Sequence, residues 1–179
     1  MKMMKKWLLL STLVLVIFTN CGKTNNTSTT DCSQLPIETN ATLIERQNLD
    51  AYLAANGLTT TAVEKNGMYY IITNQGTGVS PNLCSNLTVS YKGSLITGNT
   101  NGGVFDETLS GETASFPLSN VISGWKIIFP LVKAGGNVTL FIPPSLAYGS
   151  QSKPSKGAGY SAIPANSYLK FTVSLIAVQ

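Results

Sequence analysis

Three cysteines and the absence of histidine limit the chemistry that this 179-residue chain can perform. Without histidine the chain cannot form a Ser-His-Asp triad, a histidine general base or a histidine-ligated metal site. Three thiols, on Cys21, Cys32 and Cys84, are also too few for a four-cysteine zinc site. The remaining options for the cysteines are covalent modification and disulfide formation.

The first cysteine follows a segment with the pattern of an export signal. Lys2, Lys5 and Lys6 precede an unbroken run of apolar or small residues from Trp7 to Phe18. This run has the length of a signal-peptide core and is too short for a membrane-spanning helix of about 20 residues. A cysteine placed directly after such a run, as Cys21 is, resembles the lipobox of bacterial lipoproteins, in which the thiol is lipidated and the chain is cut just before it.

We therefore expect residues 1–20 to be a lipoprotein signal peptide and Cys21 to carry the lipid, with ordinary secretion as the alternative. The whole chain has 12 Lys and Arg against 8 Asp and Glu, a formal net charge of +4. Three of the basic residues lie in the signal, so the mature chain has nine basic against eight acidic residues. Such a balance argues against nucleic acid as a partner.

The other two cysteines, Cys32 and Cys84, remain after processing and lie in a compartment where disulfides form. We expect them to pair with each other and so attach the N-terminal segment to the start of the main domain. In the chain-entropy treatment, closing a loop of about 50 residues stabilises a fold by up to roughly 4 kcal/mol. Two unpaired thiols are the alternative.

Composition and periodicity divide the mature chain into three parts. Residues 21–38, which are rich in Asn, Thr and Ser, are expected to form a flexible tether. Residues 39–66 are expected to form a helical extension, and residues 67–179 carry strand patterns and form the main domain.

Helix and strand patterns predict an α+β main domain with a mostly antiparallel sheet. In the extension, apolar spacing predicts a helix over 39–55, with Thr39 or Asn40 as its cap and Asn56-Gly57 as its stop. In the main domain, strands are predicted at 68–72, 87–96, 138–142 and 168–178, with a turn over 97–103 and one short helix over 123–129, ended by Pro130.

Five segments of the main domain occur in the order that one family shows. They are LTVSYKG at 87–93, GVFD at 103–106, VISGW at 121–125 after Phe116, PPSLAYG at 143–149 and AIPANS at 162–167. Together these segments resemble the FKBP-type peptidyl-prolyl cis-trans isomerases over about 110 residues.

The resemblance implies an antiparallel sheet of five or six strands that curls around one short helix, here with an extra N-terminal helix. It also implies an isomerase that acts on X-Pro bonds of exported proteins and assists their folding. A non-catalytic chaperone or peptide-binding module that uses the same groove is the alternative, and a surface or adhesive β-domain is a third hypothesis.

The same motifs imply which residues form the site. Asp106, Tyr148 and Tyr91 are expected to be the catalytic polar residues, and hydrogen bonds from Asp106 and Tyr148 would orient the substrate. The proline-binding residues are expected to be Trp125 as the floor, with Phe105, Phe116, Val121, Ile122, Ile163 and Phe171 as the walls. The backbone N–H of Ile122 is a further expected donor.

Two features of the chain depart from the family pattern. No arginine follows Phe105-Asp106, where many members of the family carry one. The segment Gly149–Ala162 is long, is rich in Ser, Gly and Lys, and is expected to overhang the pocket.

Rotation about a peptide bond breaks no covalent bond, so the resemblance implies neither a cofactor nor a metal. The expected partners are proline-containing unfolded or exported polypeptides, macrolide inhibitors of the tacrolimus type, and the membrane through a lipid anchor. We expect a monomer in the cell envelope that faces the periplasm or the cell surface.

Overall fold

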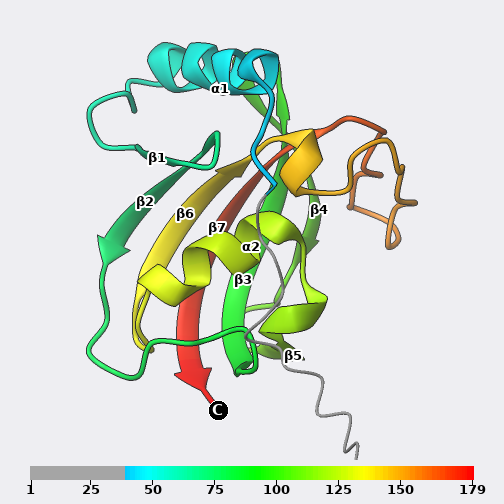
Figure 1. Cartoon of the computed structure of the whole chain (residues 1–179). Helices are drawn as coiled ribbons and strands as arrows, with labels where there is room; N and C mark the ends of the chain where they lie inside the picture. The colour runs from blue at the N-terminus through cyan, green and yellow to red at the C-terminus, as the bar shows by residue number, and fades with distance from the viewer. Residues whose placement is uncertain (1–38) are drawn as a thin grey trace, which may run out of the picture. The chain divides into compact units, whose positions relative to one another are not determined.

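One antiparallel sheet organises the chain in the computed structural model, which describes residues 39–179 (Figure 1). The described strands follow the order β1-β2-β6-β7-β3-β4, and β5 pairs with β3. Their bounds are β1 Val63–Lys65, β2 Met68–Asn74, β3 Asn86–Thr97, β4 Thr100–Glu107, β5 Ala114–Pro117, β6 Asn137–Ile142 and β7 Tyr168–Val178. The expectations for the signal peptide, the tether, Cys21 and Cys32 lie outside the described residues.

The expected α+β fold is confirmed, with an antiparallel sheet around one short helix and an extra N-terminal helix. Within the described residues the sheet has seven strands rather than five or six. The additional strand β1 forms a hairpin with β2 through Asn66 and Gly67, whose φ angles are 54° and 78°. Asn-Gly is the preferred pair for such a two-residue turn, so this dipeptide marks the hairpin in the sequence although apolar periodicity does not.

The turn predicted over residues 97–103 is shorter than expected. Strand β3 continues to Thr97 and β4 already begins at Thr100, so only Gly98 and Asn99 connect them. Strand pairing with β3 extends the regular structure into a segment whose Gly and Asn content is typical of a loop.

The short helix α2, Ser123–Ile128, crosses the face of the sheet that holds the main core (Figure 1). It ends as predicted, because Pro130 lies in the 3-10 turn η3, Phe129–Leu131, which follows it directly. Gly124 lets this helix approach β6 closely, since a Cβ atom at this position would lie 2.8 Å from Ile142. The close approach places the next residue, Trp125, directly over the sheet.

The N-terminal helix α1, Leu43–Ala55, packs on the opposite face of the sheet. Its buried residues Leu49, Tyr52 and Leu53 form a second core cluster with Phe141 of β6, whereas the neighbouring Leu140 belongs to the core under α2. Successive side chains of a strand point to opposite faces, so β6 separates the two cores.

The cap of α1 differs from the prediction. The N-cap is Thr42, which forms a capping box with Glu45, and neither Thr39 nor Asn40 has this role. The helix ends at Ala55 with Asn56 as its C-cap, followed by Gly57 with a φ of 68°, so the predicted stop at Asn56-Gly57 agrees with the structure. A domain boundary between residues 66 and 67 stays a prediction, and β1 hydrogen-bonds to β2 across this point.

Candidate active site

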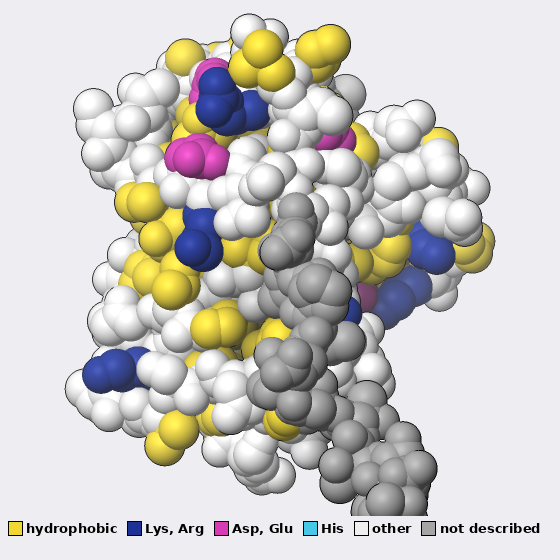
Figure 2. Space-filling view, in the orientation of Figure 1, with side chains coloured by type: hydrophobic (Ala, Val, Ile, Leu, Met, Phe, Trp, Pro, Cys, Tyr) yellow, Lys and Arg dark blue, Asp and Glu magenta, His cyan; other side chains and the backbone are white. Residues whose placement is uncertain are grey.

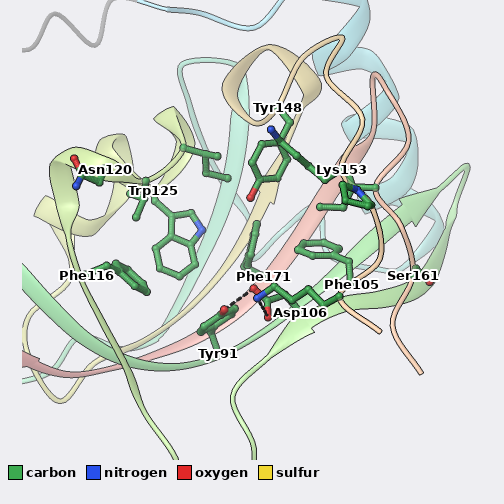
Figure 3. Close-up of a pocket in the computed structure, with 15 residues that line it drawn as sticks. Tyr91, Phe105, Asp106, Phe116, Asn120, Trp125, Tyr148, Lys153, Ser161 and Phe171 are labelled. Carbon is green, nitrogen blue, oxygen red and sulfur yellow. Dashed lines mark hydrogen bonds and ion pairs between the residues drawn. The ribbon is translucent and has the colours of Figure 1, made fainter. Parts of the chain in front are cut away.

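A cavity of about 400 Å³ lies between α2, the strands β3, β4 and β7, and the loop at residues 149–162 that precedes β7 (Figure 3). It is lined by Tyr91, Phe105, Asp106, Phe116, Asn120, Val121, Ile122, Trp125, Tyr148, Lys153, Pro154, Lys156, Ser161, Ile163 and Phe171. All ten site residues predicted from the sequence are among them. The structure therefore brings these ten together, and their individual roles stay predictions.

Trp125 forms the inner end of the cavity and is only 4% exposed. Its ring meets the rings of Tyr91 and Phe171 edge to face, at centroid distances of 5.9 and 5.2 Å. Phe116 lies 5.6 Å away on another side. Edge-to-face contacts of this kind stabilise aromatic clusters beyond simple burial, so the floor of the cavity is rigid and apolar.

The indole N–H of Trp125 is buried and has no hydrogen-bond partner among the described residues. Buried donors in proteins are nearly always paired, because an unpaired one keeps its desolvation penalty. The nitrogen lies on the side of the ring that faces the interior of the cavity (Figure 3). An acceptor on a bound molecule could satisfy this donor.

Asp106 occupies the polar wall and has a partner for each carboxylate oxygen. The Tyr91 hydroxyl donates to Oδ2 at 2.6 Å, and Nζ of Lys156 lies 2.6 Å from Oδ1. Burial, and then the hydrogen bond to Asp106, raise the pKa of the Tyr91 hydroxyl. Tyr91 therefore remains a neutral donor far into the alkaline range.

Tyr148 approaches the cavity from the side opposite Asp106, with its hydroxyl directed inward (Figure 3). The 3-10 turn η4, Pro144–Leu146, and Gly149 with a φ of 58° bracket this residue and turn the chain sharply. Burial, and then the negative charge of Asp106, raise the pKa of Tyr148, while Lys156 opposes the shift. The hydroxyl is thus held protonated and available to donate.

The 149–162 loop overhangs the cavity and contributes four lining residues that the sequence did not identify: Lys153, Pro154, Lys156 and Ser161. A two-way backbone pairing between Lys153 and Ile163 closes its base. The N–H of Ser161 also donates to the carbonyl of Val104 in β4 at 2.7 Å.

A cation reaches Asp106 although no arginine follows it in the sequence. It comes from Lys156, 50 residues later in the chain and on the overhanging loop. The fifth lining residue that was missed, Asn120, ends the 3-10 turn η2, Leu118–Asn120. No local sequence signal marks either residue, because each reaches the cavity only through the path of its loop.

Outside the cavity, Cys84 is disulfide-bonded. Its expected partner, Cys32, lies outside the described residues, so the Cys32–Cys84 pairing stays a prediction. Within residues 39–179, no three acidic, cysteine or histidine residues are grouped so that they could hold a metal ion. The same part of the chain contains no helix with the length and apolar character needed to cross a membrane.

Comparison with known proteins places this site in a family. The family model described as FKBP-type peptidyl-prolyl cis-trans isomerase matches residues 78–176. The chain is 40% identical to the peptidyl-prolyl cis-trans isomerase Mip of Coxiella burnetii over 134 residues, which is 72% of this chain and 53% of that protein. It is 37% identical to the outer membrane protein MIP of Legionella longbeachae over 132 residues, covering 73% of this chain and 52% of the relative.

Among solved structures, the crystal structure of FkpA from Escherichia coli is similar, with a TM-score of 0.56 and 33% identity. The match covers 76% of this chain and 62% of that one. The chain thus spans about half the length of the two curated relatives above.

Proposed function

The chain belongs to the family of FKBP-type peptidyl-prolyl cis-trans isomerases, and we propose that it catalyses rotation about X-Pro bonds in exported polypeptides. The observation that carries this proposal is the aromatic cavity floored by Trp125, with Asp106 and Tyr148 facing each other across it. Such a cavity fits a proline ring and leaves polar groups at its edge for the peptide backbone.

The physical basis is the electronic structure of the amide. Rotation from cis to trans crosses a barrier of about 18–20 kcal/mol, because resonance is lost when the bond is twisted. The twisted amide is less dipolar than the planar one, so an apolar cavity that excludes water favours it relative to the ground state. Binding that improves in the twisted geometry lowers the barrier without any nucleophile or proton transfer.

Three groups would orient the substrate within this cavity. The Tyr148 hydroxyl and the Ile122 N–H are donors for substrate carbonyls, and Asp106, held by Tyr91 and Lys156, directs its negative charge toward the twisting bond. The unpaired indole N–H of Trp125 supplies a further donor at the floor.

A protease-free isomerisation assay tests the activity, with a peptide in which a bulky apolar residue precedes proline. We expect the full chain to accelerate the reaction and both Tyr148→Phe and Asp106→Ala to slow it while the melting temperature changes little. A rate equal to the thermal one, together with binding of the same peptide, would favour the alternative, a non-catalytic peptide-binding module.

The cavity also suits a macrolide of the tacrolimus type, which would compete with substrate. A raised melting temperature at saturating drug would support this assignment. An unchanged melting temperature and no inhibition would exclude it.

Residues 1–20 would direct the chain to the cell envelope, where Cys21 would carry a lipid and residues 21–38 would act as the tether. The name of the Legionella longbeachae relative, outer membrane protein MIP, supports an envelope location. Intact-mass analysis of membrane-extracted protein tests the anchor, with Cys21→Ser as the control. A chain that begins at Cys21 without added acyl mass would contradict lipidation.

A further inference from the structure

The charged side chains at the rim of the cavity are not balanced. Asp106, Lys153 and Lys156 are the charged residues that line it, and Lys156 is paired with Asp106. Among the described residues, Lys153 has no carboxylate within ion-pair distance. In Figure 2 basic side chains are visible where the overhanging loop lies, with few acidic ones around them. The rim thus presents one uncompensated positive charge to whatever enters the cavity.

Backbone hydrogen bonds anchor Lys153 at the base of the overhanging loop. The N–H of Lys153 donates to the Ile163 carbonyl at 2.8 Å, and the Ile163 N–H returns a bond at 2.9 Å. The next residue, Pro154, restricts the backbone further. The Lys153 ammonium lies 5.2 Å from the centroid of the Tyr148 ring, whose hydroxyl points into the cavity. The ammonium therefore lies beside Tyr148, whose hydroxyl we expect to donate a hydrogen bond to the substrate backbone.

We propose that Lys153 is a specificity-determining residue that selects polypeptides with an acidic side chain close to the proline. This inference rests on the proposed function and adds to it a class of substrate. With proline in the aromatic cavity, the flanking chain must pass the rim, where a carboxylate can pair with the Lys153 ammonium. A partly exposed pair of this kind changes affinity by about two- to fivefold.

Four matched pairs of peptides test the proposal on the full chain. Every peptide contains Leu-Pro. Each pair varies one position, either one of the two positions before Leu or one of the two positions after Pro. The two members of a pair differ only in having Glu or Gln at that position. For at least one pair, we expect kcat/KM to be about two- to fivefold higher for the Glu peptide at low salt. The preference should decrease as salt is added, because exposed charges are screened.

Variants identify the residue responsible. Lys153→Gln should abolish the preference, Lys153→Glu should reverse it, and Lys133→Gln should leave it unchanged, since Lys133 is an exposed lysine that does not line the cavity. The absence of any preference for Glu in the unmodified chain, or its persistence in Lys153→Gln, would overturn the proposal.

The same peptides distinguish a failure of this inference from a failure of the proposed function. If none of the Leu-Pro peptides is isomerised, the proposed isomerase activity is wrong. The Glu and Gln members are then compared by calorimetric binding, where equal dissociation constants overturn the role of Lys153 and tighter binding of Glu peptides supports it.

Discussion

Glu45 in the first turn of α1 accepts two hydrogen bonds from Ser145, which lies 100 residues later in the chain. The Ser145 N–H donates to Oε1 and the Ser145 hydroxyl donates to Oε2, both at 2.9 Å. Ser145 lies in η4, three residues before Tyr148. The same carboxylate completes the capping box with Thr42. One side chain therefore joins the N-terminal helix to the segment that carries an expected catalytic hydroxyl.

Replacing Glu45 by Ala should reduce the free energy of unfolding by about 1–2 kcal/mol, because both the cap and the contact with Ser145 are lost. Denaturant titration at pH 7 measures the effect. Gln47→Ala is the matched control, since Gln47 is exposed on the same helix. An equal loss in both variants would show that the effect comes from helix propensity and not from the contact with Ser145.

The contribution of Glu45 to the free energy of unfolding should depend on pH. Burial alone would raise the pKa of Glu45, but hydrogen bonds from Thr42 and Ser145 outweigh it and lower the pKa below its ordinary value of 4.5. A carboxyl group with a lowered folded-state pKa stabilises the protein above its unfolded pKa and loses this effect as pH falls through the folded one. The stability difference between the unmodified chain and Glu45→Gln should therefore shrink between pH 5 and pH 3. A constant difference over this range would contradict the assignment.

The isomerisation rate should be level between about pH 7 and 9. The chain has no histidine to titrate in this range, and the pKa values of Tyr91 and Tyr148 are both raised, so both hydroxyls stay protonated. A pH profile of kcat/KM checks this expectation. A bell-shaped profile centred near pH 7 would indicate a proton transfer that the proposed mechanism does not contain.

Lys156→Met should lower kcat/KM by about two- to fivefold, because the exposed ion pair that holds Asp106 and the overhanging loop is lost. Lys156→Arg should restore most of the rate, since arginine keeps the charge. The salt dependence separates this role from simple packing: the rate of the unmodified chain should fall with added salt, and that of Lys156→Met should not. The same salt dependence in both would argue against the pair.

Trp125→Ala should destabilise the fold by about 3–5 kcal/mol, because a large side chain that contacts four aromatic rings is removed from the core. Trp125→Phe keeps the floor apolar and removes the unpaired N–H. We expect this variant to remain folded by circular dichroism and to bind the Leu-Pro peptide more weakly. Binding equal to that of the unmodified chain would mean that the indole nitrogen does not contact the substrate.

The strongly patterned parts of the fold were accessible from the sequence. Apolar residues alternate along β7 and recur at helical spacing in α1, and each pattern indicates one buried face. These patterns lie within single short segments, so they can be read from the sequence. The hairpin between β1 and β2 was missed because three residues are too few to show alternation, and only the turn residues Asn66-Gly67 marked it. The cap of α1 was misplaced because several Thr and Asn residues near its start have similar capping propensity.

By itself, the sequence determined the family and ten of the fifteen residues that line the cavity, because the order of the motifs and the aromatic residues within them belong to short segments. Only the tertiary structure decided that Lys156 reaches Asp106, that Lys153 lies over the Tyr148 ring, and that Glu45 binds Ser145. Glu45 and Ser145, like Asp106 and Lys156, are far apart in the sequence, and no periodic pattern relates them. Tyr148 and Lys153 are close in the sequence, but their contact depends on the path of the loop. Their geometry is set by the packing of the sheet and helices, which no local pattern of residues encodes.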